Sequence, residues 1–280
     1  MATQPSCLGG RLETLYRTFN RREYVEPDPI QFLYLYPDPL DQEVAGVIAS
    51  SLAYGRVVQI LRSVEAILST MGQRPAIFLR RIGKRRLSHM LSGFRHRFTT
   101  GDEMASLLFS VKNILSEYGS LEACFRDGYE AGFQTIVPAL SSFVQRMRAA
   151  SDSRLPSYLF PDPAQGSACK RPFMYLRWMV RRDDVDPGCW SGISPAKLVA
   201  PLDAHLFRIT RNMGFTRRNS PDLAAAMEVT SCFREIVPDD PLKYDFVLTR
   251  FGIRKDLCFH GHPLTAEVIS PSESPQGTSP

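Results

Sequence analysis

The chain of 280 residues has 34 Lys or Arg against 29 Asp or Glu, and its formal net charge is +5. Its length suffices to bury a full hydrophobic core, in one large domain or two small ones. No apolar run approaches the roughly 20 residues of a membrane-spanning helix, and residues 1–10 lack the charged start and apolar core of a signal peptide. We therefore expect a cytoplasmic protein with no membrane partner; no protein partner can be inferred.

The six cysteines are scattered along the chain, and none are spaced as Cys-x-x-Cys. This spacing favours reduced, mostly buried thiols over a disulfide framework, a zinc site or an iron–sulfur cluster. We accordingly expect neither a metal nor a cofactor.

The N-terminal part of the chain alternates helical patterns with breaks. Residues 1–20 predict a short helical lead-in, and four prolines within residues 27–39 predict an extended, aromatic-rich connection. Asp41 is expected to open the first strong helix, which the turn at residues 54–56 ends. A second helix is predicted over residues 57–71.

Apolar residues at helical spacing continue towards the C-terminus. Further helices are predicted over residues 107–118, 120–126, 136–147, 174–181, 203–213, 220–236 and 240–251. Ser220 and Asp240, each followed by a proline, are the expected caps of the last two helices. Residues 183–197 form an irregular excursion, and no period-two strand pattern is found. The sequence therefore predicts an all-α domain over residues 1–264, in two helical lobes with a cleft between them, followed by a disordered tail over residues 265–280.

The segment from Gln73 to Phe98 holds eight Lys or Arg and no acidic residue. It is predicted to contain a short helix and a loop, and its cations can neutralise phosphates by counterion release. The candidate nucleic-acid contacts within it are Arg80, Arg81, Arg85 and Arg86. A solvated basic helix without a ligand accounts for the same pattern.

The stretch Pro201-Leu202-Asp203 predicts a helix start. Pro201 stops the preceding segment, and the Asp203 carboxylate can accept from the backbone N–H groups of the first turn. Arg208 on this helix is a candidate phosphate contact, or a solvated cation. By helix physics alone Asp203 is an N-cap and nothing more.

Several phrases of the sequence resemble a family of bacterial proteins known only as a domain of unknown function. The resemblance covers about residues 30–260. Its phrases are Asp38-Pro39-Leu40, residues 48–56 (IASSLAYGR), residues 117–122 (EYGSLE), residues 167–171 (SACKR), residues 176–181 (LRWMVR) and Pro201-Leu202-Asp203. It implies no activity.

The order of these pieces is also similar, more distantly, to the helix-hairpin-helix DNA glycosylases. Those enzymes have a Gly-rich hairpin, a lysine after it in the bifunctional members, a helix, and then a segment with the catalytic aspartate. Gly166, Ser167, Ala168 and Lys170 fall where the hairpin and lysine stand, and Asp203 falls where the aspartate stands. Here the hairpin keeps one glycine, residues 183–197 lengthen the connection, and no C-terminal four-cysteine cluster is present.

This resemblance implies a base excision enzyme acting on damaged or unusual DNA, with double-stranded DNA as its partner. Asp203 would stabilise the sugar cation or orient water, and Lys170 would be the nucleophile of a lyase step. Backbone N–H groups of the hairpin around Gly166, together with Arg171, would contact phosphate. The positive charge of Arg171 would also lower the pKa of Lys170. Tyr54 or Arg56 would fill the gap left by a flipped nucleotide.

Two other functions fit the same residues. The first is a non-catalytic module that binds DNA or RNA on the same scaffold, through the basic segment. The second is a protein-interaction scaffold without nucleic-acid affinity. In the corresponding structural interpretations, Lys170 is an exposed hinge residue and Tyr54 is an aromatic residue packed at a helix end.

Overall fold

The computed structural model of the chain describes residues 5–151 and 155–253, so the tail expected over residues 265–280 lies outside the described residues. The helices are α1 Pro5–Phe19, α2 Pro39–Ser51, α3 Val57–Met71, α4 Pro75–Arg81, α5 Lys84–Leu91, α6 Gly101–Glu117, α7 Leu121–Arg126, α8 Val137–Ala149, α9 Lys170–Val180, α10 Ala204–Asn212, α11 Leu223–Ile236 and α12 Asp245–Ile253. Short 3-10 helices are η1 Arg22–Tyr24, η2 Pro29–Leu35, η3 Pro163–Gln165 and η4 Pro195–Lys197, and the strands are β1 Arg95–His96 and β2 Thr99–Thr100. The all-α prediction is confirmed.

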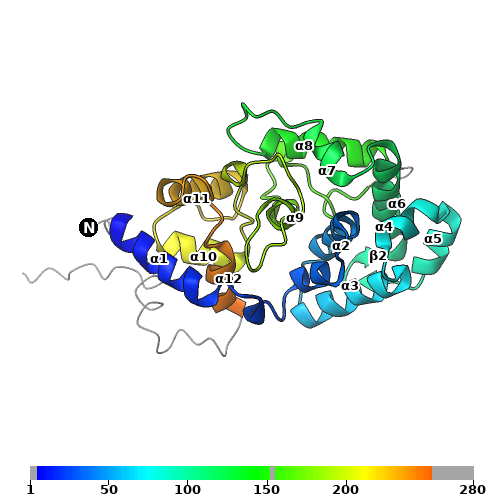
Figure 1. Cartoon of the computed structure of the whole chain (residues 1–280), viewed down its shortest axis with the longest axis horizontal. Helices are drawn as coiled ribbons and strands as arrows, with labels where there is room; N and C mark the ends of the chain where they lie inside the picture. Colours follow the sequence, from blue (N-terminus) through cyan, green and yellow to red (C-terminus); the bar gives the residue numbers. More distant parts are fainter. Residues whose placement is uncertain (1–4, 152–154, 254–280) are drawn as a thin grey trace, which may run out of the picture.

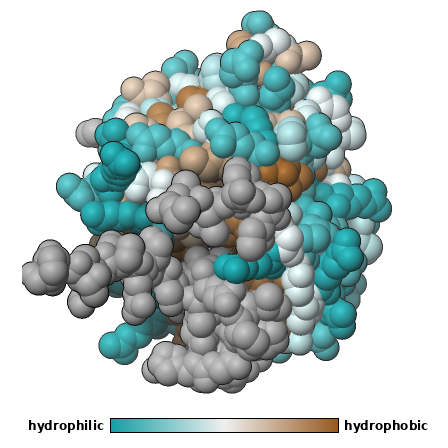
Figure 2. All heavy atoms as spheres, turned by 90° about the vertical axis from the view of Figure 1, so that its left-hand side faces the viewer, coloured by the Kyte–Doolittle hydropathy of each residue, from teal (hydrophilic) through white to brown (hydrophobic). Residues whose placement is uncertain are grey.

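The helices gather around α9 (Figure 1). Helices α2 to α6 lie on one side of it and α1, α10, α11 and α12 on the other, with α7 and α8 along the top in this view. Within the described residues no helix is long and apolar enough to cross a membrane. On the face shown in Figure 2, the surface left uncovered by grey atoms is mainly hydrophilic, with small hydrophobic areas.

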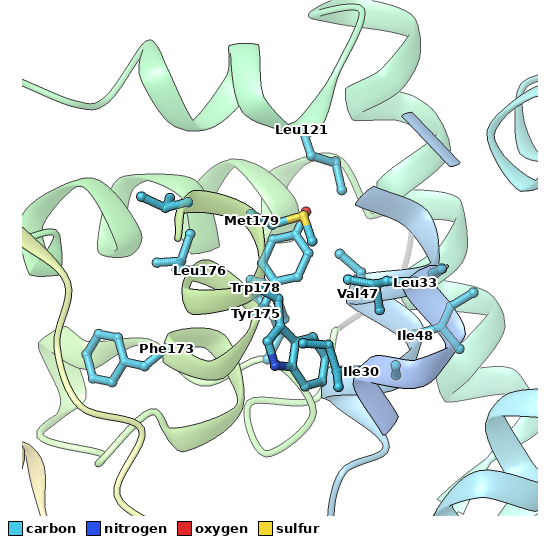
Figure 3. Packing of buried hydrophobic residues seen from close by; sticks show 14 of the residues in the cluster. Ile30, Leu33, Val47, Ile48, Leu121, Phe173, Tyr175, Leu176, Trp178 and Met179 are labelled. Atoms are coloured by element: carbon cyan, nitrogen blue, oxygen red, sulfur yellow. The ribbon is translucent and has the colours of Figure 1, made fainter. Parts of the chain in front are cut away.

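Helix α9 is buried on all sides, because every residue from Tyr175 to Val180 is buried. Trp178 and Tyr175 point from it towards Ile30 and Val47 of the α2 side (Figure 3). Burial of large aromatic side chains at native packing density contributes strongly to stability, at about 25 cal/mol per Å² of apolar surface removed from water. The helix is therefore the centre of the hydrophobic core.

Several helices begin at other residues than the sequence predicts, because more than one nearby side chain can accept from the first backbone N–H groups of the helix. Residues 29–35 form a 3-10 helix in place of an extended connection, since the Asp28 carboxylate accepts from the N–H of Ile30 at 3.0 Å. Helix α2 begins at Pro39 with Asp38 as its N-cap, while the expected opener, Asp41, is buried.

Two C-terminal helices also begin later than expected. Asp222, not Ser220, caps α11, because its carboxylate accepts from the N–H of Ala225 at 2.8 Å. Helix α12 begins at Asp245, because Asp240, the expected cap, bonds to the guanidinium of Arg181 at 2.8 Å. A side chain engaged in a tertiary ion pair is not free to cap a helix.

The basic segment is more structured than predicted. It contains two helices, α4 and α5, followed by a hairpin of β1 and β2 in which Arg95 pairs with Thr100 and His96 with Thr99. Each strand has two residues, which is too short for a period-two signal in the sequence.

Two buried arginines, Arg177 of α9 and Arg181 at its C-cap, are neutralised by aspartates from other segments. Arg177 bonds to Asp186 at 3.1 Å and also to Asp245 of α12. Arg181 bonds to Asp186 and Asp240 as well, so that Asp186, which is fully buried, receives both guanidinium groups. A buried charge is tolerated only when it is paired in this way.

The excursion over residues 183–197 folds back onto the C-terminal end of α9. The N–H of Gly188 donates to the carbonyl of Trp178 at 3.1 Å, and the N–H of Trp190 donates to that of Met179 at 2.8 Å. These bonds satisfy carbonyls that the end of a helix leaves without partners. The excursion is therefore a cap and a source of counter-charge for α9.

Glu43 of α2 is a second buried carboxylate, only 2% exposed. It accepts from the N–H groups of Leu121 and Glu122 at the start of α7 and from the indole N–H of Trp190, each at 2.8 Å. Burial raises the pKa of Glu43 to about 7, against the lowering effect of these hydrogen bonds.

Replacing Asp186 by Ala should lower the free energy of unfolding by about 3–5 kcal/mol, because two buried guanidinium groups lose a shared partner. Urea denaturation followed by circular dichroism measures this loss. Asp184→Ala is the matched control, since Asp184 is exposed two residues away, and should change the value by less than about 0.5 kcal/mol. Equal effects of the two substitutions would contradict the role of Asp186.

Glu43 should make the stability of the fold depend on pH. Its folded-state pKa of about 7 lies above the ordinary value of 4.5, so the native state binds the extra proton. The resulting stability is fully present below the ordinary pKa and is lost as the pH rises through about 7, an effect of at most about 3 kcal/mol. Denaturation midpoints from about pH 5 to about pH 8 should fall less steeply for Glu43→Gln than for the wild type.

Candidate functional site

A cavity of about 370 Å³ opens beside the N-terminal half of α9. It is lined by the turn at residues 53–55, the start of α3, the α9 residues Lys170, Met174, Arg177 and Trp178, the start of α10, and α12. This volume lies within the roughly 300–1,000 Å³ of small-molecule sites. We call this space the central cavity.

The central cavity brings together the two residues to which the resemblance gave chemical roles. Lys170 and Asp203 both line it, although 33 positions separate them in the sequence. No residue of 183–197 lines it, so the excursion does not fill the space between them. The two side chains form no ion pair with each other, which leaves room for a ligand between them.

Lys170 is the first residue of α9 and is half-buried. Its position follows from Cys169, which takes a left-handed conformation with a φ of +46° and turns the chain into the helix. Within the described residues its ammonium has no hydrogen bond or ion pair. The lysine therefore presents an uncommitted amine to the central cavity.

Asp203 is the N-cap of α10, as the sequence predicted. Its Oδ1 accepts from the N–H groups of His205 at 2.9 Å and Leu206 at 2.7 Å, while Oδ2 has no partner in the described part of the chain. These two bonds fix the carboxylate at the N-terminus of α10. His205 also lines the cavity, and no hydrogen bond to its ring is formed within the described ranges.

Three cavity-lining residues carry a buried polar atom without a hydrogen-bond partner in the described residues: Trp178 Nε1, Asp245 Oδ1 and Arg250 Nε. Buried polar groups are nearly always paired, and each exception requires an explanation such as a bound polar molecule. A polar ligand in the cavity would supply partners for these three atoms.

Asp245 is the functional candidate that sequence reasoning missed. Burial raises the pKa of its carboxyl group, the charge and hydrogen bond of Arg177 lower it, and the charge of Asp203 raises it further. Two carboxyl groups in one cavity thus have different environments, one at a helix N-terminus and one deeply buried. No local pattern marked Asp245, because its burial depends on pairing with α9.

The expected hairpin is an exposed loop in the structure. Gly166 has a φ of +75° and ends η3, Ser167 is exposed, and Ala168 is half-buried before Cys169. The loop joins a single 3-10 turn to α9, whereas a helix-hairpin-helix joins two α-helices. Gly166, Ser167 and Ala168 do not line the central cavity.

Arg171 is turned into the protein. Its guanidinium donates to the carbonyl of Ser51 at 2.8 Å and to that of Tyr158, and it lies 5.0 Å from the ring centre of Tyr54. These bonds use the guanidinium N–H groups that the sequence interpretation expected to contact phosphate.

Tyr54 lines the central cavity but is held in place. Its hydroxyl donates to the carbonyl of His96 at 3.0 Å and lies 2.6 Å from Thr99 Oγ1. Arg56, by contrast, is exposed and makes no hydrogen bond or ion pair within the residues described. Of the two predicted gap-filling residues, only Arg56 is free to move towards a ligand.

The central arginines of the basic segment lie away from the central cavity. Residues at the start of α3 line that cavity, whereas Met71 at its end lines a second cavity of about 440 Å³ together with Arg81 and Arg86. A helix of this length separates its ends by roughly 20 Å. Arg80 donates to the carbonyls of Leu115 and Gly119, while Arg85 and Arg208 are exposed.

The fold and the site define an all-helical protein with a charged, ligand-sized cavity. The chain matches, over residues 28–254, the model of a family described as protein of unknown function (DUF2400), and it belongs to that family. The matched region contains the lining of the central cavity from Asp28 to Arg250. Neither the curated proteins nor the solved structures contain a match to the chain.

Arg171→Met should lower the free energy of unfolding by about 1–3 kcal/mol, because two backbone carbonyls lose their donor. Arg208→Met, at an exposed arginine without a partner, is the matched control and should change it by less than about 0.5 kcal/mol. Thermal or urea denaturation measures both values. Unchanged stability of Arg171→Met would instead favour the phosphate-binding role expected from the sequence.

Proposed function

We propose that this protein is a DNA glycosylase-like enzyme that removes a damaged or unusual base, with a lyase step at Lys170. In this proposal helices α2 to α6 and α10 to α12 are the two lobes of a distant helix-hairpin-helix glycosylase, and the central cavity is the cleft that receives a flipped nucleotide. The observation that carries it is the meeting of Lys170 and Asp203 at one ligand-sized cavity.

The proposed chemistry uses the two residues in different roles. The neutral amine of Lys170 attacks C1′ as the glycosidic bond breaks, and the departing base keeps the bonding electron pair and takes up a proton. The Asp203 carboxylate stabilises the positive charge that develops on the sugar. Loss of a proton from the attached nitrogen and opening of the sugar ring then give a Schiff base between Lys170 and C1′.

Asp245 has the features of the accompanying proton donor. Its buried carboxyl group has a raised pKa, and its Oδ1 lacks a partner in the described structure. Burial favours the protonated form of this carboxyl group more than exposure to water would, and a protonated carboxyl group can pass a proton to a leaving base. Trp178 and Arg250 supply unpaired N–H groups that can donate to the carbonyl or ring nitrogen of a base.

Borohydride trapping tests the lyase step. Wild-type protein incubated with a panel of lesion-bearing DNA duplexes and single strands should give a covalent adduct, because borohydride reduces the Schiff base to a stable amine. Lys170→Ala should give none, and Lys84→Ala is a matched control in α5, outside the lining of the central cavity. Absence of both adduct and base release on every lesion would contradict the proposal.

Asp203→Asn separates catalysis from binding. The amide oxygen can still cap α10, so we expect the fold and DNA affinity to persist while base release falls by at least about a hundredfold, which is the usual scale for loss of one electrostatic contact to a transition state. Base release is followed by alkaline cleavage of labelled duplex, and affinity by fluorescence anisotropy. Undiminished release by Asp203→Asn would remove this residue from the mechanism.

A further inference from the structure

The hairpin of β1 and β2 places a strained two-residue turn against Tyr54 and Gly55, two residues that line the central cavity. Arg97 and Phe98 form the tip, since His96 pairs with Thr99. The φ of Arg97 is +55°, a region that arginine rarely adopts. Strain of this kind concentrates at functional sites when the surrounding structure enforces it.

The inward side of the hairpin is held rigidly. The ring of His96 lies 2.9 Å from Ser63 Oγ and 3.0 Å from the carbonyl of Tyr54, and His96 is only 2% exposed. Thr99 is fully buried against the Tyr54 hydroxyl. These contacts fix the tip relative to α3 and the turn at residues 53–55 before any ligand arrives, which reduces the entropy lost on binding.

Phe98 faces the solvent from this rigid support. It is 53% exposed, although it is one of the largest apolar side chains. Its ring stacks on Tyr54 at a centroid distance of 4.9 Å and an interplanar angle of 28°, and meets the ring of Tyr158 edge-on at 4.8 Å. The exposed half of the ring therefore extends a stack that begins at a cavity-lining tyrosine.

Two uncommitted cations lie close in sequence to Phe98 and to Tyr54, the residue on which Phe98 stacks. Arg97 lies over Gly55, where a Cβ atom would come within 2.8 Å of Arg97 Cδ, and Gly55 lines the central cavity. Arg56 is the next residue and is exposed. Neither guanidinium makes a hydrogen bond or ion pair within residues 5–151 and 155–253.

We infer that the hairpin tip is a stacking platform for an unpaired nucleotide, in which Phe98 carries the base and Arg56 and Arg97 bind the flanking phosphates. Aromatic side chains next to cations are the usual means of binding single strands, because an unpaired base has a free face. The inference rests on the proposed function in taking nucleic acid as the ligand, and assigns single-stranded nucleic acid as the form bound beside the central cavity.

Nucleic acid fits this surface better than a protein partner. The segment that bears the hairpin has eight cations and no acidic residue, so its charge complements a phosphate backbone. The arrangement also fits, because the Phe98 ring lies 4.9 Å from that of Tyr54, which lines the cavity. A strand held on the platform can therefore place one nucleotide in the cavity.

Binding of a short fluorescein-labelled single-stranded DNA at low salt tests the platform. Phe98→Ala should weaken binding roughly tenfold, the scale of one lost base–aromatic stack. Leu35→Ala, which truncates another exposed apolar side chain, is the matched control and should leave affinity unchanged. No binding by the wild type, unchanged binding by Phe98→Ala, or tighter binding of a blunt duplex than of the single strand would overturn the inference.

The salt dependence tests the two arginines. Arg56→Gln and Arg97→Gln should each reduce the slope of log affinity against log salt by about 0.7, because each removes one phosphate contact to a single strand. Arg182→Gln should leave the slope unchanged, since Arg182 is exposed beyond the C-terminal end of α9, opposite to the end that carries Lys170. A loss of slope in Arg182→Gln but not in Arg56→Gln or Arg97→Gln would overturn the assignment.

Phe98→Trp gives a direct optical readout that does not depend on truncation. The two native tryptophans, Trp178 and Trp190, are buried, so the introduced indole is the exposed fluorophore of the described chain. Its fluorescence should be quenched on addition of single-stranded DNA or RNA, and unquenched titration with either would contradict stacking. Quenching without base release would leave the platform standing and remove the glycosylase proposal, whereas base release without quenching would do the reverse.

Discussion

The structure depends on the pairing of two buried arginines, one inside α9 and one at its C-terminal end. Arg177 of α9 and the C-cap residue Arg181 cannot remain charged in the core unless carboxylates from elsewhere meet them, because an unpaired buried charge costs several kcal/mol. Asp186 arrives from the excursion that follows α9, and Asp245 arrives from α12. These segments are therefore required to fold together, which brings the C-terminal helices against the face of α9 that lines the cavity.

The same pairing divides the charges of the central cavity into two groups. Arg177 with Asp245, and Arg250 with Asp28, form ion pairs that hold the walls in place. Lys170 and the Oδ2 atom of Asp203 form none within the described residues. A cavity built in this way has rigid charged walls and separate uncommitted groups, so that the positions of those groups are fixed by interactions in which they take no part.

The sequence was sufficient for features that depend on local spacing. Helices such as α3 and α8 follow from apolar residues at a period of 3.6, and the Asp203 cap follows from a single acceptor before a helix. Where two side chains compete to cap one helix, as Ser220 and Asp222 do for α11, tertiary contacts determine which one does so, and the sequence alone does not show it. Asp245 was missed for the same reason, because nothing near it in the chain indicates that it is buried. The hairpin was missed because Arg97 occupies a left-handed position where glycine is expected.

The excursion over residues 183–197 shows why separation along the chain is a poor guide to the site. In the sequence it lengthens the path from Lys170 to Asp203 and weakens the likeness to a glycosylase. In the structure it turns back at the C-terminal end of α9, where the N–H groups of Gly188 and Trp190 satisfy the last carbonyls of the helix. It therefore closes one end of α9 and supplies Asp186 to its arginines, while the other end, which carries Lys170, stays open to the cavity. Residues inserted at the C-terminal end of α9 therefore change the packing of the core and leave the separation of Lys170 and Asp203 unchanged.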